Sequence, residues 1–280
     1  MNIKILSDST CDLSQQLLEQ HNISLIPLTV VKDGQQYKDG VTITPSDIFA
    51  HVAAGGNLCS TSANSVGEYA DEFAKYAKEY DGVLHINLGS GFSSCYQNAC
   101  IAASDFDNVK VVDSQNLSTG QGLVVLEACR LAKECASLEE LQEKVQAFTE
   151  KVEASFLVDK LTYLAKGGRC SSVAALGANL LNLKPCIDVK DGKMGVSKKY
   201  RGKYGKCLAS YVQERLEGRE DIRRDVIFVT MTSVADDEYA AVMDAVKQYG
   251  NFETVYETLA GCTVSCHCGP GTLGVLFVRK

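Results

Sequence analysis

The segment NIKILSDSTCD, residues 2–12, shows the pattern from which the fold of this chain can be predicted. A short apolar run, typical of a buried strand, passes directly into a polar loop rich in hydroxyl groups. Similar runs recur as GVLHINL (82–88) and NVKVVDS (108–114), with helical patterns between them. ISLIPLTVV (23–31) is a further extended run, in which Pro27 indicates an edge or a bend. The alternation predicts parallel strands with helices on both faces of the sheet.

The helical segments carry recognisable start signals. Thr44 has the residue type of an N-cap and is followed by a proline, which favours the start of a helix. Ser65 and Glu68 form the pattern of a capping box at the start of a helix over residues 65–80. A long amphipathic stretch later in the first half is expected to break at Ser137.

The pattern restarts after residue 153 with a strand, followed by a hairpin over residues 184–200 that turns at Asp191 and Gly192. We therefore predict an α/β protein of two lobes. Residues 1–153 are expected to form an N-terminal lobe with a parallel sheet. Residues 154–280 are expected to form a C-terminal lobe with a mixed sheet.

Composition and charge exclude several classes of protein. The chain has 280 residues, of which 45% are hydrophobic, and a formal net charge of −7, which disfavours binding to nucleic acid or to an anionic membrane. We expect no signal peptide, no transmembrane helix and a cytoplasmic location. The twelve cysteines are scattered and form no C-x-x-C pair, so we expect reduced thiols that pack as small apolar groups.

Four loops at the expected strand ends are rich in hydroxyl groups: residues 7–12, 59–65, 89–96 and 113–122. Ligands bind at such carboxyl ends in open parallel sheets. Two of the loops lie in long stretches without Asp, Glu, Lys or Arg. Neutral hydroxyls and free backbone amides suit an oxyanion, either a carboxylate or a phosphate. Helix capping by the same side chains is the structural alternative.

Familiar catalytic motifs are absent from the sequence, which has no P-loop and no G-x-S-x-G elbow. Asp8 and Asp113 follow strands and could act as acids or bases, or could cap neighbouring amides. His267 precedes a glycine-rich turn and is a candidate site residue. One hypothesis is therefore an enzyme that acts on a small carboxylated or phosphorylated metabolite through Asp8, Ser93 or His267.

The segment GCTVSCHCGPGTLG (261–274) resembles a metal or redox centre because three cysteines surround His267. We expect residues 262–268 to be extended, with Cys262, Cys266 and Cys268 on one face and His267 on the other. A single tetrahedral metal could not easily collect ligands from both faces. We therefore expect no metal site, while a metal or redox module remains a third hypothesis.

The whole chain resembles the DegV family of bacterial fatty-acid-binding proteins. The resemblance rests on several segments in the family's order, among them IKILSDSTCDLS, ISLIPLTVVKDGQQYKDG, TSANS, GSGFSSCYQNA, VVDSQNLSTGQG, LTYLAKGGR, LNLKPCIDVKDGK, YRG and HCGPGTLG. The sequence departs from the family pattern at Asn64, where proline is frequent, and at Ser94 and Cys95, where glycine and threonine are usual.

The resemblance implies a long-chain fatty acid, such as palmitate, buried in a tunnel between the lobes. It also implies that Thr61 and Ser93 bind the carboxyl group. Ser62, Ser94, Arg169, Arg201 and His267 are expected near this head group or at the contact with a partner. Apolar walls are expected from residues 48–58, 172–183 and 272–277.

The resemblance further implies a carrier without catalytic activity or cofactor. A separate ATP-dependent fatty acid kinase would phosphorylate the bound fatty acid for phospholipid synthesis. We expect no nucleic-acid partner and no stable membrane insertion. Burial of the tail at about 0.8 kcal/mol per methylene group would provide tight binding without strong contacts to the head group.

Overall fold

A four-stranded parallel sheet organises the N-terminal half, in a computed structural model that describes residues 1–174 and 183–280. The strand order is β2 (Ser24–Ile26), β1 (Ile3–Asp8), β6 (Gly82–Asn87) and β7 (Val109–Asp113). Every residue of β6 is buried, as expected for a parallel strand covered on both faces.

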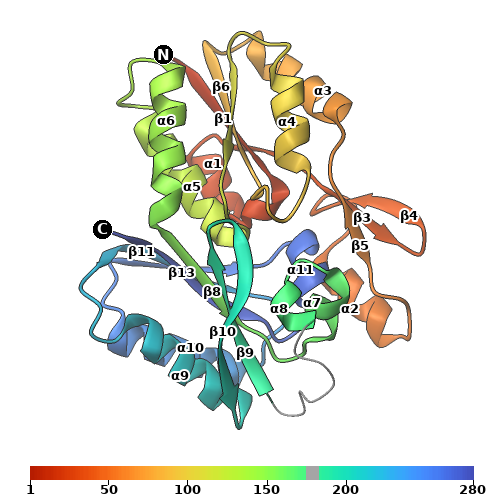
Figure 1. The fold of residues 1–280 in the computed structure, drawn as a ribbon, viewed down its shortest axis with the longest axis vertical. Coiled ribbons are helices and arrows are strands. Elements are labelled where there is room, and N and C mark those ends of the chain that lie inside the picture. The colour runs from red at the N-terminus through yellow and green to blue at the C-terminus, as the bar shows by residue number, and fades with distance from the viewer. Residues whose placement is uncertain (175–182) are drawn as a thin grey trace.

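Helices cover both faces of this sheet, as predicted (Figure 1). One face packs against α3 (Val66–Ala77) and α4 (Cys95–Ala103), and the other against α5 (Ser118–Leu131) and α6 (Leu138–Phe148). The capping box of Ser65 and Glu68 is present, and Ser137 caps α6. A short helix α1 (Gln15–Gln20) follows the 3-10 turn η1 (Ser9–Cys11).

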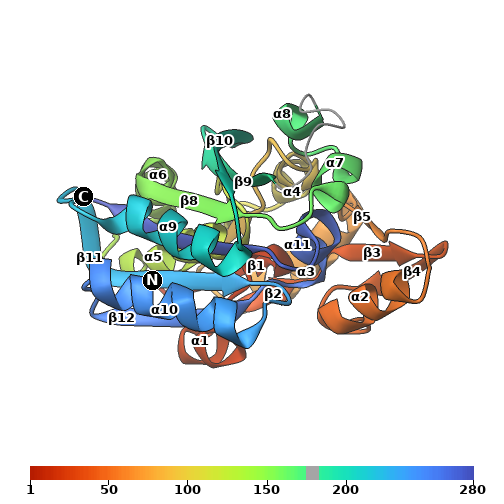
Figure 2. The same cartoon turned by 90° about the horizontal axis from the view of Figure 1, so that it is seen from below.

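A small three-stranded antiparallel sheet lies at the side of the molecule (Figures 1 and 2). It consists of β4 (Gln35–Lys38), β3 (Thr29–Lys32) and β5 (Ser60–Ser62), and α2 (Pro45–Ala53) lies beside it. The extended run predicted at 23–31 is therefore divided, since β2 and β3 belong to different sheets. Pro27 lies at the division, where it donates no backbone hydrogen bond.

A six-stranded mixed sheet forms the C-terminal half, as predicted. Among the described strands of this sheet, only β11 and β12 pair in parallel. The 3-10 turn η2 (Thr149–Lys151) precedes the sheet. The strand order is β10 (Lys193–Arg201), β9 (Leu183–Lys190), β8 (Val152–Leu157), β13 (Leu273–Arg279), β11 (Ile222–Met231) and β12 (Thr254–Leu259).

The helices of the C-terminal half are α7 (Thr162–Gly167), α8 (Ser171–Ala174), α9 (Tyr204–Leu216), α10 (Asp236–Tyr249) and α11 (Cys262–Cys268). Helices α9 and α10 pack together below the sheet in Figure 1. The hairpin of β9 and β10 turns at Asp191 and Gly192, as predicted.

Helix α5 connects the two large sheets because it contacts β1 and β6 on one side and β8, β11 and β13 on the other. Most of its residues are buried, as expected for a helix enclosed by protein on all sides. One core cluster accordingly contains Leu84 of the parallel sheet and Phe228 of the mixed sheet. The boundary predicted at residue 153 falls within β8 and remains a prediction.

The strand predicted over residues 262–268 is wrong, because this segment forms helix α11. Asp39 accepts hydrogen bonds from the backbone N–H groups of Cys262 (2.8 Å) and Thr263 (3.1 Å) at the start of the helix. These bonds satisfy donors that have no partner within the helix. Gly269, at φ +74°, follows the last helical residue.

The helix changes which side chains of this segment share a face. Cys262 and Cys266 lie one turn apart and pack with Cys59 in a small apolar cluster. Cys268 lies in the main core instead, so the three cysteines do not form the single face that was predicted. His267 occupies the last turn of α11 rather than the end of a strand.

Candidate functional site

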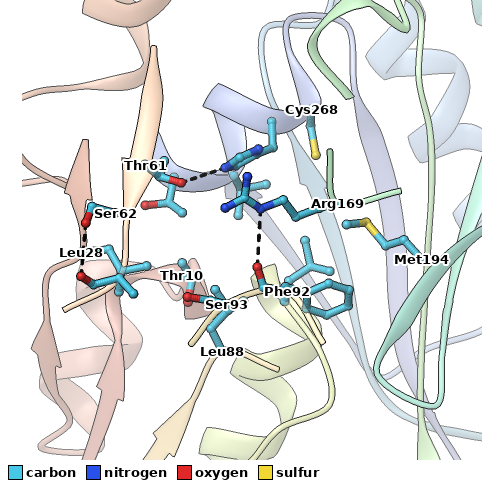
Figure 3. A pocket seen from close by; sticks show the side chains of 15 residues that line it. Thr10, Leu28, Thr61, Ser62, Leu88, Phe92, Ser93, Arg169, Met194 and Cys268 are labelled. Atoms are coloured by element: carbon cyan, nitrogen blue, oxygen red, sulfur yellow. Dashed lines mark hydrogen bonds between the residues drawn. The ribbon is translucent and has the colours of Figure 1, made fainter. Parts of the chain in front are cut away.

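A small cavity of about 50 Å³ lies where the two halves of the chain meet (Figure 3). We call it the interlobe cavity. Among its described lining residues, Arg169 is the only Asp, Glu, Lys or Arg. The lining consists of Thr10, Leu28, Thr61, Ser62, Ala63, Leu88, Phe92, Ser93, Leu117, Arg169, Met194, Thr263, Val264, His267 and Cys268.

Five of the seven site residues predicted from the sequence line this cavity: Thr61, Ser62, Ser93, Arg169 and His267. Ser94 and Arg201 are not among its described lining residues. Ser94 is exposed at the N-cap of α4. Arg201 is exposed at the end of β10, where it pairs with Leu183.

Thr61 and His267 join the two halves of the chain through a hydrogen bond of 2.8 Å between Oγ1 and Nε2 (Figure 3). Thr61 comes from β5 and His267 from α11. His267 Nδ1 is buried, has no hydrogen-bond partner in the described structure, and faces Gly167. This favours the tautomer with the ring proton on Nε2, because an unpaired Nδ1–H would be costly. The Thr61 hydroxyl proton is then available to another acceptor.

His267 is neutral near pH 7. Burial and the positive charge of Arg169 lower the pKa of His267 to about 4. Arg169 itself is held by carbonyl oxygens, because Nη1 donates to Gly167 (2.7 Å) and Nε donates to Phe92 (3.5 Å). The cavity therefore combines one fixed positive charge with neutral hydroxyl and imidazole groups, which suits a single carboxylate.

Ser93 lies in the loop between β6 and α4. Its Oγ donates to Sγ of Cys95 (3.1 Å) and accepts from the Cys95 backbone N–H (3.3 Å). A thiol is a weak acceptor, so a carboxylate oxygen could readily replace it as the partner of the Ser93 hydroxyl. Burial raises the pKa of the Cys95 thiol, which keeps the sulfur uncharged.

Asp8 supports the cavity wall from inside the protein. Its fully buried carboxylate accepts hydrogen bonds from Tyr69 Oη (2.8 Å), Asn87 Nδ2 (3.1 Å) and the backbone N–H of Leu88 (2.8 Å). Asp8 is not among the described lining residues, whereas Leu88 is. Asp8 therefore fixes a segment of the wall, and its position does not support a role in direct chemistry.

Asp12 and Asp39 anchor helix α11, and through it His267, to the N-terminal half of the chain. Asp12 accepts hydrogen bonds from the Gly261 backbone N–H (2.9 Å) and from Ser118 Oγ (2.6 Å). Asp39 binds the first turn of the helix as described above. Both carboxyl groups are buried. Asp12 belongs to the loop 7–12, which the sequence suggested as part of a ligand site, and Asp39 belongs to the segment YKDG. The role of these two carboxyl groups in holding α11 was not predicted.

A second cavity, of about 30 Å³, lies next to the interlobe cavity, and we call it the apolar cavity. The two cavities share Leu117, Val264 and Cys268 as walls. Phe156, Met231 and Leu276 contribute apolar surface further inside. A tunnel between the lobes stays a prediction, and the described structure has two small adjacent cavities at this place.

Of the apolar walls predicted from the sequence, the segment 272–277 contributes Thr272, Gly274 and Leu276 to the apolar cavity. Most of the segment 172–183 lies outside the described residues. The segment 48–58 is not among the described lining residues of either cavity.

Thr263 is a lining residue that sequence reasoning missed. It lies one helical turn before His267, and both side chains line the interlobe cavity. A helical interpretation of the terminal segment would have revealed the pair, since residues four apart share a helix face. In the described part of the chain, no group of three His, Cys, Asp or Glu side chains could hold a metal ion.

The family model described as "Uncharacterised protein, DegV family" matches residues 2–280. The chain belongs to the DegV family. A DegV domain-containing protein of Clostridium acetobutylicum is 33% identical over 280 residues, which cover 99% of each chain. Protein DegV of Bacillus subtilis is 29% identical over 283 residues, which cover 100% of each chain.

Solved structures of similar proteins share the fold over nearly the whole chain. The fatty-acid-binding DegV family protein of Thermus thermophilus superposes with a TM-score of 0.88 at 30% identity, covering 100% of both chains. A stearic-acid-binding protein of Eubacterium ventriosum gives a TM-score of 0.82 at 27% identity, covering 99% of this chain and 98% of that one. Among the described helices of this protein, none has the length and apolar character needed to cross a bilayer.

Proposed function

We propose that this protein binds a long-chain fatty acid, such as palmitate, with its carboxyl group in the interlobe cavity and its tail in the apolar cavity. The observation that carries this proposal is the adjacency of a hydroxyl-lined cavity and an apolar one. Among proteins of similar structure, a DegV family protein of Thermus thermophilus binds fatty acid, and a protein of Eubacterium ventriosum binds stearic acid. Thr61 and Ser93 are proposed to donate hydrogen bonds to the carboxylate, while Arg169 provides a positive field.

We further propose that the protein is a carrier without catalytic activity, which presents the carboxyl group to a separate ATP-dependent fatty acid kinase. Arg169 is exposed where it meets the interlobe cavity, so the head group would lie close to the surface. Ser94 and Arg201 are also exposed and are candidates for contact with that kinase. The enzyme hypothesis, through Asp8, Ser93 or His267, has weaker support. Ser93 and His267 line the cavity, but Asp8 does not, and His267 has no acidic partner in the described structure.

Lipid analysis of the purified protein tests the first proposal. Protein produced in bacteria should carry about one fatty acid per chain by native mass spectrometry, and organic extraction should release it. Stripped protein should take up palmitate. Bare polypeptide together with no uptake of palmitate would refute the proposal.

Head-group recognition is tested with Thr61→Ala combined with Ser93→Ala. Hydrogen bonds to charged groups contribute roughly 1.5–3 kcal/mol each, so we expect the loss of two to lower palmitate affinity by at least about a hundredfold. Ser94→Ala is a matched control, because Ser94 adjoins Ser93 in sequence but is exposed at the N-cap of α4. Equal affinities of the double variant and the control would contradict the assigned roles.

A further inference from the structure

Thr263 carries a buried hydroxyl that the structure leaves without a partner. The residue is 5% exposed, its side chain lines the interlobe cavity, and Oγ1 has no hydrogen-bond partner in the described structure. Because Thr263 and His267 are four residues apart in α11, the two side chains share one face of the helix. The hydroxyl therefore belongs to the same wall as the imidazole that binds Thr61.

The other buried threonine hydroxyls in the described structure form hydrogen bonds within the protein, and Thr263 is the exception that has to be explained. The paired ones include Thr10 with Gln121, Thr119 with Thr230, Thr149 with Gln146, and Thr272 with Cys268. A buried polar group without a partner destabilises the folded protein. Such groups persist where they serve a function, and a cavity wall is a suitable place for one.

The backbone of Thr263 is held rigidly. Its N–H donates to Asp39 Oδ2 (3.1 Å), and the N–H of Cys262 donates to Asp39 Oδ1 (2.8 Å). Asp39 is 4% exposed and also accepts a hydrogen bond from Ser9 Oγ (3.0 Å). The backbone from which the Thr263 side chain projects is thus held in place before any ligand binds, which reduces the entropy lost on binding.

We propose that Thr263 is a third hydroxyl ligand of the fatty-acid carboxylate, in addition to Thr61 and Ser93, and that Asp39 is the residue that positions it. This inference rests on the proposed function. An ionised carboxyl group has two oxygens and about four acceptor sites, so it can accept from three hydroxyls at once. The neutral His267 stays hydrogen-bonded to Thr61 and orients that hydroxyl.

The decisive variant is Thr263→Val, which removes the hydroxyl while nearly preserving the shape of the side chain. Two effects of opposite sign are expected. The affinity of stripped protein for palmitate should fall about tenfold, as for a lost hydrogen bond to a charged group. The melting temperature of the same stripped protein should rise by about 2 °C, because an unpaired buried polar group is gone.

Two further variants serve as controls for this experiment. Thr263→Ser keeps the hydroxyl and should retain palmitate affinity within about threefold. Thr149→Val removes a buried hydroxyl that donates to Gln146. Thr149 is not among the described lining residues of either cavity, so this variant should leave palmitate affinity unchanged. Asp39→Asn should weaken palmitate binding less than Thr263→Val, since an amide oxygen can still accept from the helix.

The outcomes separate the two proposals. If the wild-type protein binds palmitate and Thr263→Val binds it equally well, the role of Thr263 is refuted while fatty-acid binding stands. A lower melting temperature for stripped Thr263→Val would show that the hydroxyl is paired inside the protein, and would also refute the inference. If wild-type protein takes up no palmitate, the proposed function fails and this inference fails with it.

Discussion

His267 differs from an ordinary surface histidine because its neighbours disfavour a positive charge. Burial acts most strongly and Arg169 adds to it, so the pKa of His267 falls from its usual value of 6.5 to about 4. A neutral ring can hold Thr61 by a simple hydrogen bond, while Arg169 attracts the carboxylate. His267 thus orients the Thr61 hydroxyl, and Arg169 provides the positive charge.

The titration of His267 is the first prediction. In NMR spectra of stripped protein, one of the four imidazoles should titrate near pH 4, and its signal should be absent from His267→Gln. Because the folded pKa is lowered, His267 contributes stability that is present above pH 6.5 and is lost as the pH falls through about 4. A His267 signal that titrates above pH 6 would contradict this assignment.

Asp12 has the opposite pH dependence. Burial raises its pKa to about 8, against the hydrogen bonds from Ser118 and Gly261, which lower it, while nearby Asp39 raises it further. Folded protein then binds one more proton than the unfolded chain between about pH 4 and pH 8. The contribution of Asp12 to the free energy of unfolding is therefore fully present at acid pH and is lost as the pH rises through 8.

Asp12→Asn tests this second prediction, because asparagine keeps an acceptor for Gly261 and offers its Nδ2 group to Ser118. Urea unfolding at pH 5 and pH 9 should show that the wild type loses at least about 2 kcal/mol of stability relative to the variant, given about 1.4 kcal/mol per tenfold change in proton affinity. Parallel pH profiles for the two proteins would show that Asp12 is ionised throughout.

Helix α11 shows how an element can depend on distant residues. Its seven residues, CTVSCHC, include three cysteines and no strong helix former, so the segment by itself does not favour a helix. Its first turn is bound by Asp39, 223 residues earlier in the chain, and the preceding Gly261 by Asp12, 249 residues away. The helix therefore requires the assembled N-terminal half of the protein.

Gly269 at the end of this helix is expected to tolerate no side chain, and it gives the third prediction. Its φ is +74°, and an added Cβ would lie 2.6 Å from the ring of Tyr163. Gly269→Ala should lower the free energy of unfolding by about 2–4 kcal/mol, from backbone strain and overpacking together. Urea unfolding measures this loss.

Gly67→Ala is the control for Gly269→Ala. Gly67 lies in the first turn of α3, where an added Cβ would meet nothing within 4 Å. Alanine should stabilise that helix by roughly 0.5 kcal/mol or more. Similar losses of stability in both variants would show that the backbone conformation of Gly269 is unimportant.

The contrast between α3 and α11 explains which elements could be predicted from the sequence. The capping box of α3 lies within four residues, Ser65 to Glu68, so a local pattern was sufficient. The caps of α11 come from remote residues, so the local sequence pattern wrongly predicted a strand. The antiparallel sheet of β3, β4 and β5 was missed for the same reason, since Val30 pairs with the distant Thr61.

At the site, the hydroxyls of Thr61 and Ser93 could be proposed because both lie in charge-free stretches of sequence and match the family's pattern. Ser93 lies in a loop beyond β6, as expected, whereas Thr61 lies within strand β5. Thr263 could not be predicted, because its orientation depends on the helical form of α11. The burial of Asp8 also required the assembled fold, since Tyr69 and Asn87 reach it from other elements. Local sequence thus indicates candidate groups, while packing decides which of them reach the cavity.

The two large sheets share one core, and this leads to the fourth prediction. Helix α5 lies between the sheets, and residues from both belong to one buried cluster. Scanning calorimetry should therefore show a single cooperative transition, with equal calorimetric and van't Hoff enthalpies. Two separate transitions would show that the lobes fold independently of each other.

The small volumes of the interlobe and apolar cavities have a consequence for the kinetics of lipid exchange. The cavity volumes of about 50 Å³ and 30 Å³ are much smaller than the roughly 300–1,000 Å³ of typical ligand pockets. If the protein binds palmitate as proposed, the cavities are too small for the ligand in this conformation. Uptake of palmitate then requires the walls to move apart first. In stopped-flow experiments, the uptake rate should reach a plateau as the palmitate concentration rises, because the opening step becomes limiting. A rate that stays proportional to concentration would argue against such a step, whereas a plateau would measure how often the protein opens.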